Sequence, residues 1–215
     1  PKSSPPVIFM ITPLAPSIDV SSNGLCTACF AASSALFSPD ALPIPICAIP
    51  VSFIIVLTSA KSKFTVPVKL IMQGATARTE DSEEFEKIIS EYRDVQGIEF
   101  WHKNLIGEEW QKALLGVDVI IAPYAAERYR YHWSAMLFTA IGFYKPILQS
   151  PEMNPEVLAA YNVGEAVALD SVAAFTEQLE AFVNSYPEKH GQYKQGLIEA
   201  NEAYSHENLI KAILR

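Results

Sequence analysis

Residues 117–148 have the sequence VDVIIAPYAAERYRYHWSAMLFTAIGFYKPIL, which gives the clearest indication of the fold. Its first six residues form a largely apolar run that stops at Pro123, as in a strand covered on both faces. A charged loop leads to a helical pattern from about Ser134 to Ile141, and a short apolar strand, Pro146 to Leu148, follows. A strand, a helix and a second strand in this order indicate a parallel βαβ unit.

The same alternation continues on both sides of this unit, from Val66 to the end of the chain. The predicted strands are Val66–Met72, Ile98–Trp101, Val117–Ala122, Pro146–Leu148 and Glu165–Leu169. The predicted helices begin near Ser82, Glu108, Ser134, Pro155, Ser171, Glu188 and His206. We therefore expect an α/β domain over residues 66–215, with a doubly wound, Rossmann-like parallel sheet that carries helices on both faces.

Residues 1–65 have a different composition. They hold only five charged side chains but nine of the fifteen prolines and all three cysteines. Pro43, Pro45 and Pro50 remove backbone donors, so a regular helix or a central strand cannot pass through them. We expect this Pro/Ser/Ala-rich segment not to be part of the native fold. Its abrupt meeting with the charged remainder near Lys61 suggests a truncated or frame-shifted N-terminal region.

The apolar stretch Ala41–Ala60 is twenty residues long without a charge, which approaches the length of a membrane span. Three prolines in it argue against a spanning helix, and no basic region with a clean cleavage site marks a signal peptide. The sequence favours a cytoplasmic protein whose membrane association, if any, is peripheral.

Cys26 and Cys29 form a C-x-x-C pair, the spacing of redox and zinc sites. A tetrahedral zinc site needs two further ligands at a similar spacing, and neither a second C-x-x-C nor a C-x-x-H is present. Incidental thiols are therefore favoured over metal or redox chemistry. The chain has no cysteine after Cys47, so its folded part has no disulfide framework and suits a reducing compartment.

The net charge of −8 excludes a basic surface that could follow a nucleic-acid backbone. Positive charge gathers only locally, in the loop before the Ser134 helix, where Arg128, Arg130 and His132 follow Glu127. Ligands of doubly wound sheets bind at the carboxyl ends of the strands, where helix N–H groups attract anions. The loop is thus suited to a diphosphate, and the alternative is a solvated loop whose charges only maintain solubility.

This stretch resembles the nucleotide-sugar-binding half of retaining, group 1-like glycosyltransferases, which are built from two Rossmann-like domains in the GT-B architecture. The matching positions are Asp118, Pro123, Tyr124, Arg130, Ser134, Ala140, Lys145 and Pro146. Lys69–Gly74 resembles the strand and glycine turn that precede this segment in the family, and Asn162–Leu169 resembles the strand that follows it.

The resemblance implies a donor site for a nucleoside diphosphate sugar, with the phosphates at the Ser134 helix N-terminus and Glu165–Asp170 closing one wall. The implied donor-binding residues are Gly74, Glu127, Arg128, Arg130, Trp133, Ser134, Ala135 and Thr139. No metal and no cofactor other than the donor substrate is implied. For Trp133, stacking on a base or sugar competes with simple packing.

Several departures from the family pattern leave two functions open. Thr139 stands where the family has a glutamate that contacts the donor ribose, and Ala135 replaces a glycine. The strand and helix with the family's diphosphate-clamping arginine and lysine have no recognisable counterpart, and the acceptor domain is missing. The chain is therefore expected to be a glycosyltransferase donor domain, inactive as this fragment, or a degenerate nucleotide-binding domain. A flavodoxin-like signalling domain is disfavoured, because no acidic cluster follows a first strand.

Overall fold

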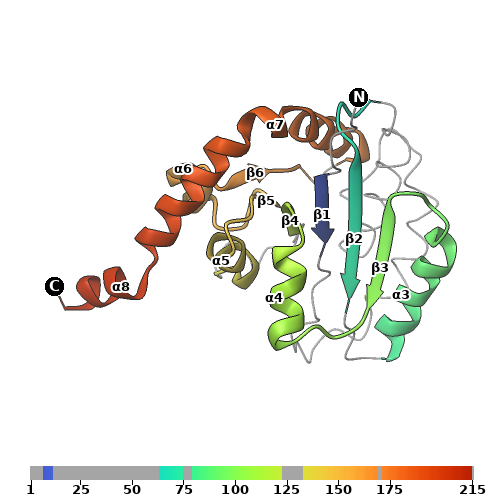
Figure 1. Ribbon diagram of the computed structural model, residues 1–215, viewed down its shortest axis with the longest axis horizontal. Helices are drawn as coiled ribbons and strands as arrows, with labels where there is room; N and C mark the ends of the chain where they lie inside the picture. The colour runs from blue at the N-terminus through green and yellow to red at the C-terminus, as the bar shows by residue number, and fades with distance from the viewer. Residues whose placement is uncertain (1–6, 12–62, 75–78, 123–132, 169–170, 215) are drawn as a thin grey trace.

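The computed structural model describes residues 7–11, 63–74, 79–122, 133–168 and 171–214. Their strands form one sheet with the order β3-β2-β1-β4-β5-β6, and every neighbouring pair is parallel (Figure 1). The strands are β1 Val7–Ile11, β2 Val68–Gly74, β3 Ile98–His102, β4 Val119–Ala122, β5 Ile147–Gln149 and β6 Gly164–Ala166. The predicted α/β fold class is confirmed.

The central strand β1 comes from the segment that we expected to lie outside the fold. Val7 pairs with Val68 of β2, and Phe9 pairs with both Leu70 of β2 and Val119 of β4. The expectation for residues 1–65 therefore fails for these five residues. Their sequence VIFMI is the continuous apolar run that a central parallel strand needs. Prolines on both sides of this run gave the segment the composition of an irregular region, so the strand was not predicted. The three cysteines and Ala41–Ala60 lie outside the described residues.

Helices connect the strands and extend beyond the last one. They are α3 Thr79–Tyr92, α4 Gly107–Leu115, α5 Ala135–Gly142, α6 Pro155–Ala160, α7 Val172–Ala203 and α8 His206–Ile213. In this described part of the chain, no helix combines the length and the apolar composition that crossing a membrane requires.

Helix α7 corrects the expectation of two helices separated at Pro187. It runs for 32 residues with Pro187 inside it, and Figure 1 shows it changing direction as it passes the β6 edge of the sheet. Proline removes one N–H donor and clashes with the preceding turn, which bends a helix without necessarily ending it. Apolar packing on both sides of Pro187 keeps the helix continuous.

The two faces of the sheet carry separate hydrophobic clusters. The first, which we call the α7 cluster, includes Leu70, Met72, Val119 and Ile121 from the strands and Phe175, Leu179, Phe182, Val183, Tyr186 and Tyr193 from α7. The second, the α5 cluster, includes Ile71, Ile120 and Ile147 from the strands, Leu114 from α4, Leu137 and Ile141 from α5, and Leu197 and Ala200 from α7. Side chains alternate between the two faces along each strand. Helix α7 packs on one face as far as Tyr193 and contributes to the other face from Leu197 onward.

Candidate functional site

All six strands run in the same direction, so their carboxyl ends lie along one edge of the sheet. The last residues of β2, β3, β4 and β5 at this edge are Gly74, His102, Ala122 and Gln149. The connection from β4 leads directly to the N-terminus of α5, which therefore begins at the same edge. Three predicted site residues, Glu127, Arg128 and Arg130, lie in 123–132, outside the described residues.

Ser134 is the N-cap of α5, as its position before the apolar helix predicts. Its hydroxyl oxygen accepts the N–H of Leu137 at 3.3 Å, and its own N–H donates to Oδ1 of Asn154 at 2.9 Å. Ser134 is also only 2% exposed. A phosphate at this helix end would therefore have to displace Asn154 in order to contact the N–H of Ser134. In the described part of the chain, the N–H groups of Ala135 and Met136 are those left open at this helix end.

Asn154 lies in the connection that follows β5, and its side chain holds the start of α5 in place. Its backbone is left-handed, with φ of 42°, and its side chain is buried. Nδ2 donates to Oε1 of Glu156 at 3.1 Å, so the amide is oriented with Oδ1 towards Ser134. Nothing in the local pattern of α5 indicates this partner, because Asn154 lies twenty residues further along the chain.

Gln149 ends β5 at the same edge and is fully buried. Its Nε2 donates to the carbonyl oxygen of Met153, which closes the turn before Asn154. Its Oε1 has no hydrogen-bond partner among the described residues. A buried acceptor without a partner is uncommon in folded proteins, and here it belongs to the residue that pairs with Ala122, the last residue of β4.

Trp133 immediately precedes the cap and packs on an aromatic cluster. Its ring centroid lies 4.9 Å from that of Phe138 in α5 and 6.0 Å from that of Tyr204 at the end of α7. The residue nevertheless remains 65% exposed. Packing thus supports the indole ring of Trp133 on one side, and most of the side chain remains accessible next to the N-terminus of α5.

The three remaining predicted residues occupy different settings. Ala135 is exposed in the first turn of α5, and Thr139, one turn further on, is half-buried. A Cβ at Gly74 would lie 3.0 Å from Cε1 of Phe85, so packing against α3 already explains the glycine.

Lys145, a residue of the family pattern, turns away from the carboxyl edge. Its Nζ donates to the carbonyl oxygens of Val117 at 2.6 Å and Leu115 at 3.2 Å, which precede β4. Burial lowers the pKa of Lys145, and the negative charge of Asp118 partly opposes this shift. Lys145 therefore secures the amino end of β4 and does not contribute to the carboxyl edge.

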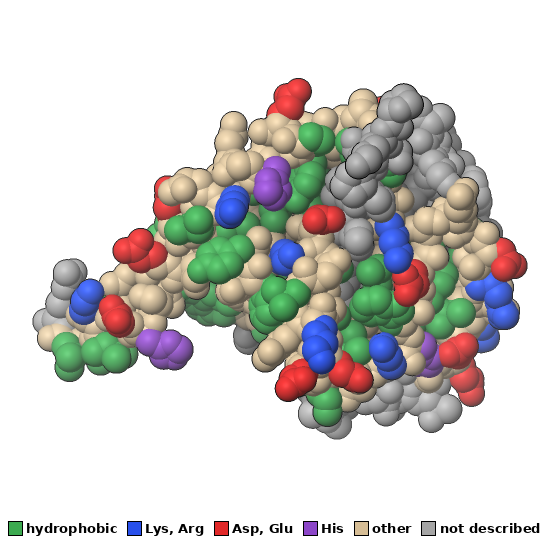
Figure 2. Space-filling model, viewed as in Figure 1, with side chains coloured by type: hydrophobic (Ala, Val, Ile, Leu, Met, Phe, Trp, Pro, Cys, Tyr) green, Lys and Arg blue, Asp and Glu red, His purple; other side chains and the backbone are tan. Residues whose placement is uncertain are grey.

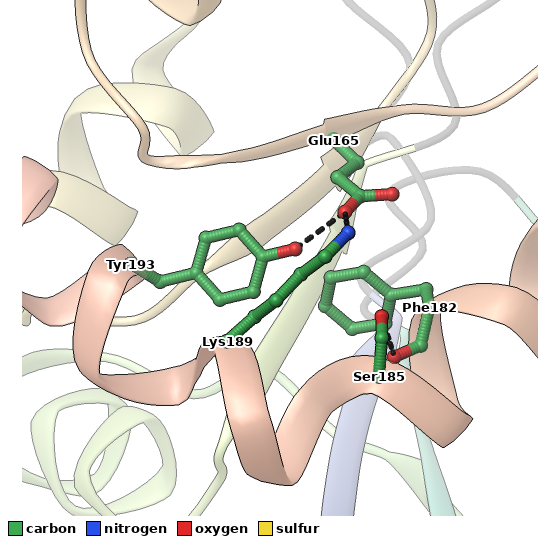
Figure 3. Close-up of polar contacts among 5 residues, drawn as sticks. All are labelled: Glu165, Phe182, Ser185, Lys189 and Tyr193. Carbon is green, nitrogen blue, oxygen red and sulfur yellow. Dashed lines mark hydrogen bonds and ion pairs between the residues drawn. The ribbon is translucent and has the colours of Figure 1, made fainter.

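Glu165, expected to close one wall of the donor site, instead binds α7 (Figure 3). One carboxylate oxygen, Oε1, accepts from Nζ of Lys189 at 2.8 Å and from the hydroxyl of Tyr193 at 2.5 Å. Burial and the hydrogen bond to Glu165 raise the pKa of Tyr193. This contact, which we call the α7 latch, joins β6 to the part of α7 beyond Pro187. Lys189 and Tyr193 lie four residues apart on one helix face, which is the only local signal for it.

Metal coordination by the described residues has no structural basis at this edge. In the ranges that the structure describes, no group of three or more histidine, cysteine, aspartate or glutamate side chains is arranged to hold a metal ion.

Comparison with solved structures identifies the fold. The C-terminal domain of a group 1 glycosyl transferase family protein, LpcC from Francisella tularensis, matches with a TM-score of 0.59 and 10% identity, over 94% of this chain and 87% of that domain. HepE from Anabaena, in complex with UDP and glucose, matches with a TM-score of 0.57 and 10% identity, over 97% of this chain and 47% of HepE.

A third match is the catalytic domain of starch synthase IV from Arabidopsis thaliana, bound to ADP and acarbose. Its TM-score is 0.51 at 10% identity, over 91% of this chain and 34% of that one. The chain thus spans less than half the length of HepE and of the starch synthase domain. The sequence matches no protein-family model and no curated protein. At this identity the likeness shows the fold alone, which is that of the C-terminal Rossmann-like domain of GT-B glycosyltransferases.

Proposed function

We propose that this chain is the donor-binding domain of a glycosyltransferase and binds the diphosphate of a nucleoside diphosphate sugar. The observation that carries the proposal is the N-terminus of α5 at the carboxyl edge of the sheet, where the N–H groups of Ala135 and Met136 have no hydrogen-bond partner among the described residues. These donors and the positive end of the helix dipole favour a phosphate.

Support for the ligand class comes from two sources. Solved structures with the same fold hold UDP and glucose in HepE, and ADP in starch synthase IV. Arg128 and Arg130 precede the helix by a few residues in the sequence and can supply charged hydrogen bonds to phosphate oxygens. Exposed Trp133 adds an aromatic surface on which a base or a sugar can stack.

We infer that sugar transfer requires more than this chain. An acceptor must be held within about 3–3.5 Å of the anomeric carbon, which a single domain rarely arranges. The sequence also has no arginine or lysine between Ile11, where β1 ends, and Lys61, although the family's diphosphate clamp follows the first strand. Thr139 offers a single neutral hydroxyl on a short side chain, where the family's glutamate has two carboxylate oxygens that accept hydrogen bonds from the ribose.

These same departures favour a second candidate, a domain that binds a nucleotide without catalysing transfer. It shares the α5 site with the first candidate, and the two differ only in turnover. We expect both to bind UDP or GDP, and only the enzyme to release nucleotide from the matching sugar donor when an acceptor domain is supplied.

Titration calorimetry with UDP and GDP tests the proposed site. We expect Arg130→Ala to weaken binding about ten-fold, because a hydrogen bond to a charged group is worth about 1.5–3 kcal/mol. Arg93→Ala is the matched control, since Arg93 is exposed in the connection between α3 and β3. Equal affinities for wild type and Arg130→Ala would remove Arg130 from the site, and no binding by the wild type would refute the proposed function.

A further inference from the structure

A second polar cluster lies at the carboxyl edge, between β3 and the first turns of α3. Nε2 of His102, the last residue of β3, is 3.2 Å from the hydroxyl oxygen of Ser82. Nδ1 of the same ring pairs with Oε1 of Glu86. Ser82 and Glu86 are one helical turn apart on α3, so they contact the two nitrogens of one imidazole.

The chemistry of Glu86 fixes the direction of these hydrogen bonds. An ionised carboxylate only accepts, so Nδ1 carries the proton that His102 donates to Glu86. In the neutral ring Nε2 is then an acceptor, and the hydroxyl of Ser82 donates to it. A serine hydroxyl bonded to a histidine whose other nitrogen is held by a carboxylate is the arrangement that activates a serine nucleophile.

Packing holds the imidazole in this orientation. The ring of Phe85 meets that of His102 edge to face, with centroids 5.1 Å apart and planes at 85°. Phe85 is itself buried, and its ring fills the space above Gly74. His102 therefore has a supported ring, with 22% of its side chain exposed.

Ser82 and Glu86 also line a surface depression of about 460 Å³, together with Glu83, Lys87 and Ser90. Figure 2 shows acidic and basic side chains close together on the face that α3 and β3 form. Two carboxylates at the depression repel anionic ligands, which favours a neutral substrate over a phosphorylated or carboxylated one.

From this geometry we propose that Ser82 is the nucleophile of a second site, which hydrolyses short neutral carboxylic esters. Its residues are separate from the proposed donor site at α5. His102 takes the hydroxyl proton as Ser82 Oγ attacks the ester carbonyl, and then gives that proton to the departing alcohol as the C–O bond breaks. Water, deprotonated by the same nitrogen, attacks the acyl group, and the proton returns to Ser82 as the carboxylic acid leaves.

Hydrolysis of p-nitrophenyl acetate by the full chain tests the site, and covalent labelling by a fluorophosphonate locates the nucleophile. Ser82→Ala is expected to abolish labelling and to reduce turnover to the rate in buffer. Removal of a general base costs about 100-fold or more, so His102→Gln should lose at least that factor. Glu86→Gln should lose about ten-fold or more, less than at a fully buried triad because 58% of the Glu86 side chain is exposed.

Ser185→Ala is the control, because Ser185 lies on α7, outside this site, and its hydroxyl donates to the carbonyl oxygen of Phe182. Ser185→Ala should retain the labelling and the turnover of the wild type, and circular dichroism should show that every variant is folded. Absence of labelling in the wild type, or equal labelling of wild type and Ser82→Ala, would overturn the proposal.

Discussion

Oδ1 of Asn154 accepts the backbone N–H of Ser134 at 2.9 Å, and this bond links the turn after β5 to the first residue of the α5 cap. The two residues are both buried. The bond therefore sets where α5 begins relative to the carboxyl edge, and with it the direction in which the N–H groups of Ala135 and Met136 point.

Replacement of Asn154 separates the hydrogen bond from the backbone conformation. Asn154→Gly keeps the left-handed conformation and should cost about 1–3 kcal/mol of unfolding free energy, the price of an unsatisfied buried N–H. Asn154→Ala should cost about 1 kcal/mol more, because alanine is strained at φ of 42°. Urea denaturation of both variants measures the difference, and an alanine variant as stable as the glycine variant would contradict it.

Two glycines of α7 should respond to alanine in opposite ways. A Cβ at Gly196 would lie 2.4 Å from the carbonyl oxygen of Asn162, so Gly196→Ala must displace backbone and should cost about 1–3 kcal/mol. A Cβ at Gly191 would meet nothing within 4 Å, and Gly191→Ala should stabilise the helix by about 0.5–1 kcal/mol. Thermal and urea unfolding of the pair checks the sign of each change, and destabilisation by both would show that Gly191 is also packed.

The α7 latch makes stability depend on pH in the alkaline range. Burial and Glu165 raise the pKa of Tyr193, so the folded state favours the protonated phenol. This contribution is fully present below about pH 10, the pKa of an unperturbed tyrosine, and is lost as pH rises through the folded-state pKa. Denaturation between pH 8 and 11 should show the stability advantage of wild type over Tyr193→Phe shrinking above pH 10. An advantage independent of pH would contradict this.

At neutral pH, Tyr193→Phe should cost about 1–2 kcal/mol, because Glu165 loses one charged hydrogen bond but keeps Lys189. Tyr186→Phe is the control. Tyr186 belongs to the same buried cluster, and its hydroxyl has no hydrogen-bond partner among the described residues. A loss for Tyr186→Phe equal to that for Tyr193→Phe would mean that the hydroxyl bond to Glu165 contributes little.

Local apolar pattern predicted most of the sheet, because strands covered on both faces need continuous hydrophobic runs such as Val119–Ala122. It failed for Val7–Ile11, where prolines on both sides gave the segment the composition of an unstructured region. It also failed at Pro187, where the local rule for proline was overridden by packing against both clusters. A local pattern reflects only residues that are neighbours in the sequence, whereas β1 and the helix around Pro187 are both stabilised by contacts with strands far away in the sequence.

The candidate site shows the same division. A helix that begins near Ser134 follows from the apolar run after this residue, and the structure confirms it, with Ser134 as the N-cap. Its burial by Asn154 and the binding of Glu165 to α7 depend on side chains twenty or more residues away, and no local pattern contains them. The roles of Glu127, Arg128 and Arg130 remain predictions, because those residues lie outside the described part of the chain.

The course of α7 around the β6 edge has a consequence for mechanical unfolding. A force applied at the C-terminus would first act on the segment beyond Pro187, which packs through Leu197 and Ala200 against the α5 cluster. Peeling would then meet Tyr193 and Lys189 at the α7 latch before it reaches Phe182 and the other sheet face. The helix would detach from its C-terminal end and pause while the α7 latch is intact. A single-molecule force trace should therefore contain an intermediate held by the latch, and Tyr193→Phe should lower the force at which this intermediate ruptures.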